Sequence, residues 1–372
     1  MAEAVKIKHI EVIPIVVPLA ETFRGSKYSM SERATLITRV FTDDGAVGEA
    51  YNGDEPDTQH EIARIILDEL QPLIMGRDPL MVEQCWEAML PPTYDILRNR
   101  KLVVMAIAAV DSALWDLVGK VAGLSVSELW GGYRRELPIM AIGGYYGKTD
   151  TQLAAEMQDY RDMGLCGCKL KIGGLSPAED AHRFKVAQAA AGDDFVFTVD
   201  ANQGYSVAEA VEFVRLAGAE YIRWFEEPVR WYNDARGMRD VRFMAGVPVA
   251  AGQSEFNRKG VGELISSGAI DVCNYDASWG GGPTEWRRVA GMAQVYGVEM
   301  GHHEEAQIAA HMLASVPHGT YVEVFHPTRD PLFWDLIANR PPIVNGMYTV
   351  PSEPGWGLEL DWDYVEHHRD DK

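Results

Sequence analysis

The chain has 372 residues, 47% of them hydrophobic and 24% charged, which is typical of a globular protein and excludes a disordered or fibrous one. Lys and Arg number 34 against 55 Asp and Glu, and the net charge of −21 argues against binding to nucleic acid or anionic membranes. Four cysteines are too few for a disulfide framework, and no signal peptide or membrane-spanning run is evident, so we predict a cytoplasmic protein.

The first 55 residues are predicted to form strands joined by turns. Ile7–Val17 and Ala34–Thr42 are rich in β-branched residues, and Asp43-Asp44-Gly45 is a typical hairpin turn. The polar segment Ala20–Arg33 between them is expected to be a mobile loop. From residue 56 to 130 the pattern becomes helical, with Glu61–Leu70 and the long apolar Lys101–Val121. We therefore predict an α+β domain over residues 1–132.

Strands and helices alternate after residue 132, which predicts a parallel sheet. The expected strands are Met140–Gly144, Cys168–Ile172, Phe195–Asp200, Tyr221–Glu226, Val247–Ala251, Asp271–Asn274, Val298–Gly301 and Tyr321–Val324. The expected helices are Ala178–Ala190, Val207–Ala217, Gly260–Ser267, Thr284–Val295 and Gln307–Ala314. Eight strands favour a closed (β/α)8 barrel, of the TIM type, over residues 133–335. Residues 336–372 are expected to return to the first domain through a strand at Leu358–Tyr364.

Polar side chains stand at the ends of six predicted strands, 29, 26, 27, 23 and 27 residues apart: Lys171, Asp200, Glu226, Gln253, Asp276 and His303. Each interval is one strand–helix unit, and parallel barrels gather their functional groups at the carboxyl ends of the strands. The sequence therefore predicts an active site at that end of the barrel.

Lys169 and Lys171 lie two residues apart on one predicted strand, so both point into the barrel. Neighbouring ammonium groups lower each other's pKa, which would allow one of them to act as a base. Solvated lysines are the alternative, but Cys168, Leu170 and Ile172 alternate with them as in a buried strand.

Asp200 and Glu226 end successive strands, where two acids repel each other unless a cation lies between them. Oxygen ligands favour Mg²⁺, with Mn²⁺ as an alternative, over Zn²⁺. Asn202 either faces the site or fixes the loop as a turn. Glu227 points away from Glu226 and is interpreted as structural.

Asp276 and His303 also end successive strands. A carboxylate bonded to one ring nitrogen orients the imidazole and raises its pKa, and the other nitrogen remains free to exchange protons. The neighbouring His302 is expected to point away from the site.

Taken in order, these motifs resemble the enolase superfamily, and within it the mandelate racemase-like group. In the first domain the similar segments are Ala113-Leu114-Trp115-Asp116-Leu117 and Leu129-Trp130-Gly131-Gly132. In the second they are Lys169-x-Lys171, Val199-Asp200-x-Asn202, Glu226-Glu227-Pro228, Asp276 and His303. The similarity spans nearly the whole chain.

The resemblance implies a capping domain over a (β/α)8 barrel, one Mg²⁺, a small carboxylate substrate and a homo-oligomer. Such enzymes remove the proton α to a carboxylate and stabilise the enediolate with the metal. By position, the resemblance makes Lys171 a general base supported by Lys169, and the His303–Asp276 pair a second acid–base group on the opposite face. It also implies metal ligands at Asp200 and Glu226, a hydrogen bond from Glu323 to the enediolate, and contacts of Phe23, Arg24 and Tyr28 with the distal end of the substrate.

Two departures from the family pattern matter. The third metal ligand is usually an acid, and here Gln253 holds that place; its amide oxygen can bind Mg²⁺ but adds no charge. Glu255 has the same strand parity and is an alternative ligand. The segment after Asp276 contains no lysine, unlike the muconate-cycloisomerase-like branch, and this favours the branch with a histidine pair.

The leading hypothesis is an Mg²⁺-dependent dehydratase of an acid sugar, an aldonate or aldarate, that eliminates water by β-elimination. A racemase or epimerase of a 2-hydroxy acid would use the same two opposed bases. A Schiff-base aldolase using Lys169 or Lys171, and a barrel that has lost its chemistry with the third acid, are the remaining alternatives.

Overall fold

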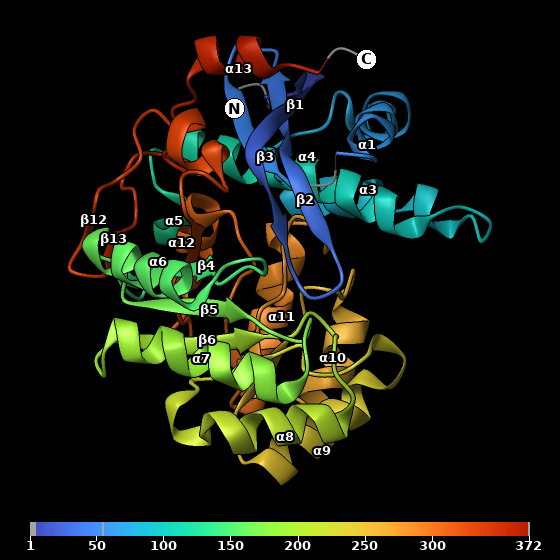
Figure 1. Ribbon diagram of the computed structural model, residues 1–372. Coiled ribbons are helices and arrows are strands. Elements are labelled where there is room, and N and C mark those ends of the chain that lie inside the picture. The colour runs from blue at the N-terminus through green and yellow to red at the C-terminus, as the bar shows by residue number, and fades with distance from the viewer. Residues whose placement is uncertain (1–4, 54–55, 371–372) are drawn as a thin grey trace.

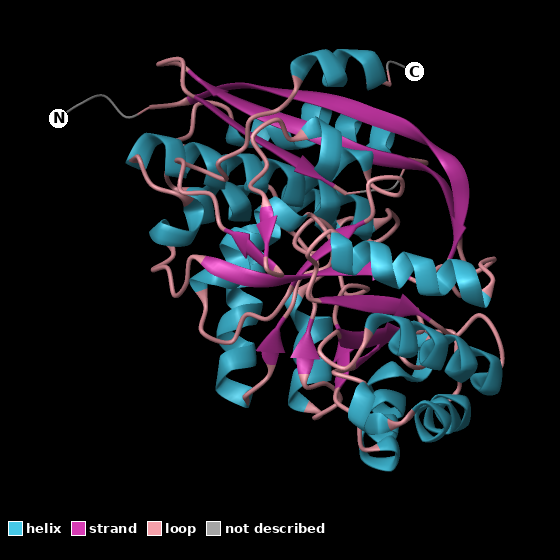
Figure 2. Cartoon of the chain, turned by 60° about the vertical axis from the view of Figure 1, so that its left-hand side comes forward, coloured by secondary structure: helices cyan, strands magenta, loops and turns pink. Residues whose placement is uncertain are grey.

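The computed structural model describes residues 5–53 and 56–370. A twisted antiparallel sheet with its helices lies over a barrel of parallel strands that is surrounded by helices (Figures 1 and 2). This is a capping domain on a (β/α)8 barrel, as the sequence predicts.

The sheet of the capping domain has the order β1 (Ile7–Arg24), β2 (Ser29–Thr42), β3 (Val47–Asn52). The predicted hairpin turn joins β2 to β3. The backbone N–H of Thr42 donates to the carbonyl of Ala46 at 3.0 Å, and Gly45 has a φ of +93°, which suits glycine. Residues 13–17 of β1 alternate in burial, so one face of this strand contributes to the core, whereas residues 33–38 of β2 are all buried.

The prediction of a mobile loop over residues 20–33 is wrong. Strand pairing continues to Arg24 and Ser29, and the chain reverses where the N–H of Gly25 donates to the carbonyl of Tyr28 at 3.0 Å. Figure 1 shows this hairpin reaching from the sheet down to the barrel. A register shift between Pro18 and Phe23 interrupts the apolar alternation, so periodicity alone could not detect the extended strands.

Helix α4 (Arg100–Ala122) is the central helix of the capping domain and confirms the prediction for 101–121. It is long and apolar enough to cross a membrane, but 89% of its apolar stretch is buried inside the molecule, where it packs on β2 and β3. The other helical segments of this domain are α1 (Gln59–Arg64), η1 (Ile65–Leu70), α2 (Gln71–Ile74), α3 (Val82–Ala88), η2 (Pro91–Tyr94) and α5 (Val126–Leu129).

Eight parallel strands form the barrel in chain order. They are β4 (Glu136–Gly143), β5 (Gly167–Lys171), β6 (Val196–Asp200), β7 (Phe225–Glu226), β8 (Val249–Ala251), β9 (Val272–Cys273), β10 (Glu299–Met300) and β11 (Val322–Phe325). The barrel closes because β11 pairs with β4 and Met300 of β10 bridges Gly319 just before β11. Each strand overlaps one predicted from the sequence, which confirms the barrel.

Seven helices alternate with these strands: α6 (Asp150–Asp162), α7 (Pro177–Ala191), α8 (Val207–Ala217), α9 (Asp234–Ala245), α10 (Arg258–Ser266), α11 (Pro283–Tyr296) and α12 (Ala306–Ser315). The sequence analysis missed α6 and α9. Each buries only three residues of its length, so the apolar stripe is narrow among many charged side chains.

The last segment contains a π-helical turn, η5 (Leu332–Leu336), and a hairpin of β12 (Ile343–Val344) and β13 (Met347–Thr349) that pairs with the start of β4. The prediction of a strand at 358–364 is wrong, because Asp361 caps a helix, α13 (Trp362–His368), by accepting from the N–H of Tyr364. The chain does return to the capping domain: the N–H of Asp370 donates to the carbonyl of Pro14 on β1 at 2.9 Å.

Two buried acids in α4 join the capping domain to the rest of the chain. Asp111 accepts from the backbone N–H of Thr284 at 2.8 Å and from its hydroxyl at 2.7 Å, at the start of α11. Asp116 accepts from the N–H groups of Glu49 and Trp356 at 2.8 and 2.9 Å. These bonds fix the capping domain relative to the strand ends beneath it.

Candidate active site

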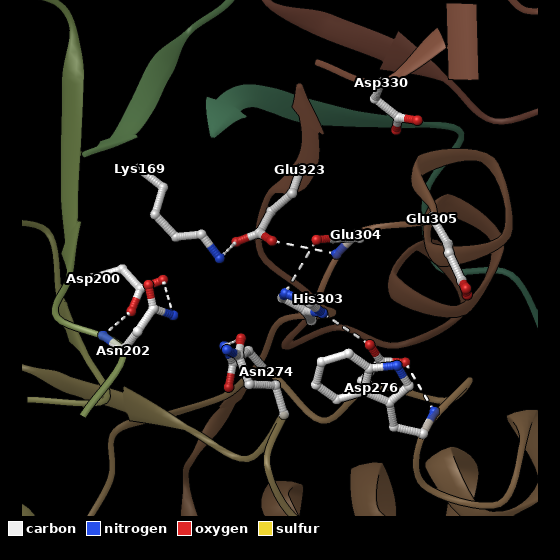
Figure 3. Close-up of polar contacts among 12 residues, drawn as sticks. Lys169, Asp200, Asn202, Asn274, Asp276, His303, Glu304, Glu305, Glu323 and Asp330 are labelled. Carbon is white, nitrogen blue, oxygen red and sulfur yellow. Dashed lines mark hydrogen bonds and ion pairs between the residues drawn. The ribbon is translucent and has the colours of Figure 1, made fainter. Parts of the chain in front are cut away.

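Eight polar side chains meet at the carboxyl ends of the barrel strands, and none is more than 7% exposed. They are Lys169, Lys171, Asp200, Glu226, Gln253, Asp276, His303 and Glu323. Figure 3 shows several of them projecting toward one another from the barrel. Polar groups at this density in a buried place require partners, and most of these side chains form ion pairs or hydrogen bonds with one another.

The two lysines are paired with carboxylates rather than with each other. Lys169 Nζ lies 2.9 Å from Glu226 Oε1 and 2.6 Å from Glu323 Oε1, and Lys171 Nζ lies 2.6 Å from Asp200 Oδ2. Burial opposes their charge, but the carboxylates outweigh it and raise the pKa of both lysines. Lys171 does lower the pKa of Lys169, as predicted, but the carboxylates outweigh this effect, so the expected lowered pKa is wrong for this state.

Asp200 and Glu226 are neighbours in register on β6 and β7. Burial raises the pKa of Glu226, and the carboxylates of Asp200 and Glu323 raise it further. A nearby cation would therefore stabilise the ionised form of Glu226. Gln253, after β8, accepts from Asn274 Nδ2 at 3.0 Å; Asn274 Oδ1 is buried and forms no hydrogen bond within the described residues. Carboxylate and amide oxygens on successive strands fit Mg²⁺.

Glu255 does not join these acids. Its carboxylate lies against Gly260 in α10, and within residues 5–53 and 56–370 it forms no group with Asp200 and Glu226 whose oxygens lie within 4.8 Å of one another. Asn202 does face the site, because its Oδ1 accepts from Lys171 Nζ at 3.2 Å.

Glu227 has a left-handed φ of +39°. It accepts hydrogen bonds from Ser254 Oγ at 2.5 Å, Gln203 Nε2 at 3.3 Å and Gln253 Nε2 at 3.4 Å, so it lies beside a residue of the site. The structural role of Glu227 stays a prediction.

His303 and Asp276 form the predicted pair. His303 Nδ1 lies 2.9 Å from Asp276 Oδ2, while Asp276 Oδ1 accepts from the N–H groups of Ser278 and Trp279 at 2.7 and 3.2 Å. Burial would lower the pKa of His303, but Glu304 and Asp276 outweigh it and raise that pKa to about 9. The imidazole is thus held in its protonated form at neutral pH.

Glu304 is a residue of the site that the sequence analysis missed. Its Oε1 lies 3.4 Å from His303 Nε2, its Oε2 lies 2.6 Å from Arg33 Nη2 on β2, and its N–H donates to Glu323 Oε2 at 3.3 Å. Figure 3 shows Glu304 between Glu323 and His303. The run His302-His303-Glu304-Glu305 just after a predicted strand could have pointed to Glu304 as a site residue. The directions of these side chains, however, depend on the left-handed conformations of Glu304 and Glu305, which the sequence pattern does not predict.

Glu304 and Glu305 have φ values of +57° and +49°. Such conformations cost roughly 1–3 kcal/mol each in a residue other than glycine, and they commonly mark functional sites. Glu305 faces the capping domain, where it accepts from the N–H of Gly53 at 2.6 Å and from the hydroxyl of Ser278.

Three residues at the tip of the β1–β2 hairpin are expected to contact the substrate, and this stays a prediction. The Tyr28 ring centre lies 5.7 Å from Lys171 Nζ, and the buried Phe23 packs edge-on against Tyr145 at 5.3 Å. Arg24 is exposed and the structure does not bring it to the site.

Asp276, His302 and Glu305 also place possible ligand atoms within 4.8 Å of one another. Each already has a partner: His302 Nε2 accepts from the N–H of Ala277 at 3.0 Å, and the two carboxylates hold the contacts given above. His302 is therefore a structural residue, as predicted.

Comparison with known proteins agrees with this architecture. Residues 9–131 match the mandelate racemase/muconate lactonizing enzyme N-terminal domain, and residues 152–364 match the enolase C-terminal domain-like family. The chain belongs to the mandelate racemase/muconate lactonizing enzyme family of the enolase superfamily. It is an enzyme of that superfamily, as the resemblance of its motifs implied.

Curated relatives include dehydratases and cycloisomerases. The chain is 30% identical to D-galactarolactone cycloisomerase of Agrobacterium fabrum, over 93% of this chain and 94% of the relative. It is 32% identical to arabinonate dehydratase of Saccharolobus solfataricus, over 90% of each chain. The names of these two relatives refer to a sugar-acid lactone and to a sugar acid.

A crystal structure of a mandelate racemase/muconate lactonizing enzyme from a marine actinobacterium in complex with magnesium is also similar. It shares 52% identity with this chain, with a TM-score of 0.93 over 98% of this chain and 99% of that one. The similarity extends over both the capping domain and the barrel.

Proposed function

We propose that the protein is an Mg²⁺-dependent dehydratase of an acid sugar. The observation that carries the proposal is the placement of Lys171 and His303, both buried, at strand ends on nearly opposite sides of the barrel. Their strands, β5 and β10, lie three positions apart around the eight-stranded barrel in one direction and five in the other. A base and a protonated acid on nearly opposite walls can act on neighbouring carbons of one substrate.

Asp200, Glu226 and Gln253 are the residues that would hold Mg²⁺, since they offer oxygen atoms from three successive strands. The bound ion would supply positive charge to the two acids in place of the lysines, and to the substrate carboxylate, which favours loss of the α-proton.

Lys171 takes the α-proton in the first step as a neutral amine, so its ammonium group must first release its own proton to solvent. Burial lowers the pKa of Lys171 and the Asp200 carboxylate raises it, so a cation held by Asp200 would favour that release. The α-carbon–hydrogen bond breaks and its electron pair forms the enediolate. Lys169 lies between Glu226 and Glu323 and is buried, so its charge stabilises negative charge that develops on the substrate carboxylate.

His303 completes the elimination. Its Nε2 donates a proton to the β-hydroxyl as the carbon–oxygen bond breaks, so the leaving group departs as water. The resulting enol then tautomerises to a 2-keto-3-deoxy acid. The high pKa of His303, about 9, supports this role because the proton is present before the reaction begins.

A cycloisomerase is the second candidate, favoured by the cycloisomerase of Agrobacterium fabrum among the relatives. The same lysine and histidine would then open a lactone, with the ring oxygen as the leaving group and no loss of water. An epimerase of a 2-hydroxy acid would need His303 to lose its proton and act as a base, which its raised pKa disfavours.

The test is incubation of the protein and Mg²⁺ with pooled aldonic acids, aldaric acids and aldarolactones in D2O, followed by mass spectrometry. Loss of one water from an acid supports the dehydratase. Isomerisation of a lactone without loss of water supports the cycloisomerase, and deuterium gain alone supports the epimerase. Both of these outcomes contradict the proposal.

A further inference from the structure

The carboxylate of Glu304 lies on the reactive nitrogen of His303. Since Asp276 holds Nδ1, the proton that His303 can transfer is on Nε2, and Glu304 Oε1 lies 3.4 Å from that atom. A substrate group that reaches Nε2 must therefore also come close to Oε1. Both side chains are at least nine-tenths buried.

The capping domain fixes this carboxylate in place. Arg33 of β2 binds Oε2 of Glu304 at 2.6 Å and Oδ1 of Asp330 at 3.1 Å, and all three residues are buried. Oε2 is thus bound by Arg33, whereas Oε1 lies beside His303 Nε2 and can accept a hydrogen bond from a substrate hydroxyl that reaches this nitrogen.

Glu304 brings a buried negative charge to the reactive nitrogen of His303. A second substrate carboxylate that reached this nitrogen would lie against the carboxylate of Glu304 and be repelled, whereas a hydroxyl could donate a hydrogen bond to it.

We propose that Glu304 accepts a hydrogen bond from a substrate hydroxyl and excludes a second carboxylate, so that the enzyme takes aldonates rather than aldarates. The inference rests on the proposed action on acid sugars, but it concerns which acid is bound. It identifies Glu304, held by Arg33, as a substrate-binding residue that sets specificity.

The test measures binding by calorimetry with Mg²⁺ present, in a Lys171→Ala background that stops turnover. The probes are pairs that differ only at carbon 6, such as galactonate with galactarate and gluconate with glucarate. We expect at least one aldonate to bind about 30-fold or more tightly than its aldarate. Adding Glu304→Gln should reduce this preference to about fivefold or less.

Two control variants separate the role of Glu304 from a general change in charge or folding. Asp330→Asn removes a charge from the same arginine without touching His303, and should keep the preference. Glu304→Asp retains the negative charge and should also keep it. Thermal unfolding of each variant checks that the fold is intact.

Aldarates that bind as tightly as aldonates, a preference that survives Glu304→Gln, or no binding of either class would each overturn the inference. The proposed reaction is judged separately with the active enzyme. A protein that dehydrates only aldarates would retain the proposed reaction and lose this inference. A protein that shows the stated binding preference but eliminates no water would retain this inference and lose the proposed reaction.

Discussion

The two halves of the candidate active site are held in different ways. The lysine half, Lys169, Lys171, Asp200 and Glu226, comes from the consecutive strands β5, β6 and β7. Its ion pairs with Asp200 and Glu226 join residues 29 and 57 positions apart, and the ion pair of Lys169 with Glu323 reaches β11, so all of them lie within the barrel. This half is therefore built by neighbouring strand–helix units.

The histidine half, Asp276, His303, Glu304 and Arg33, needs the capping domain. The contact of Arg33 with Asp330 spans 297 positions, and that of Gly53 with Glu305 spans 252. The electrostatic state of His303 thus depends on a guanidinium that positions Glu304 from outside the barrel. We infer that the barrel alone supplies the base and the metal ligands. The protonation of the acid, His303, depends in addition on Arg33 of the capping domain, which positions Glu304.

The largest effect that we expect is in the lysine half. Lys171→Ala should lower kcat/KM about 10³-fold or more on an identified acid sugar, because the general base is lost. Steady-state kinetics by coupled assay measure it. The matched control is Lys185→Ala, an exposed lysine of α7, which should behave as wild type. Full activity of Lys171→Ala would contradict the assigned base.

Metal binding should depend on the lysine half alone. Asp200→Asn should weaken Mg²⁺ about 100-fold by calorimetry, because one of two carboxylate ligands loses its charge. Asp276→Asn, a matched change in the histidine half, should leave the Mg²⁺ affinity unchanged. Equal effects of the two variants would show that the halves are not independent.

The contact between the domains can be weakened near the histidine half. Thr284→Val at the start of α11 removes the hydroxyl that donates to Asp111 and accepts from Trp115 Nε1, leaving both buried without that partner. We expect a loss of about 1–3 kcal/mol in the free energy of unfolding, measured with urea.

Thr151→Val, at an exposed position of α6, is the control and should change stability by no more than about 0.5 kcal/mol. A loss of similar size in both variants would mean that the buried bonds at Thr284 contribute little to the union of the two domains.

Gln253, which follows β8 next to the lysine half, gives a smaller and opposite effect. Gln253→Glu adds a charged ligand beside Asp200 and Glu226 and should tighten Mg²⁺ about tenfold, limited by repulsion from Glu227, which lies 3.4 Å from the amide nitrogen. Titration calorimetry checks this. An unchanged affinity would indicate that residue 253 is not a ligand.

The same difference between the halves explains what could be predicted from the sequence. Lys171, Asp200 and Glu226 stand at strand ends in local motifs, so the strand–helix repeat alone brings them together. The lysine pKa could not be predicted, because it depends on which carboxylate each ammonium group meets in three dimensions.

The role of Glu304 could not be predicted for a related reason. The direction of the Glu304 side chain follows from its left-handed backbone conformation. Its partner, Arg33, lies in a segment whose polar composition predicts a loop. Helices α6 and α9 could not be predicted because each buries only three residues against the rest of the molecule. So few buried positions leave a weak helical pattern of apolar residues in the sequence.

The smallest effect concerns the pH dependence of the histidine half. His303 faces the carboxylates of Asp276 and Glu304, which raise its pKa, and the ammonium group of Lys169, which lowers it. Because the acid form is the active one, kcat/KM should fall as the pH rises through about 9. Glu304→Gln removes a negative charge beside the imidazole and should move this fall about one pH unit lower. Asp330→Asn is the control, because the Asp330 carboxylate contacts Arg33 and not the imidazole, and it should leave the midpoint of the fall in kcat/KM unchanged. A shift of equal size in both variants would show that the direct contact between Glu304 and His303 does not raise the pKa of His303.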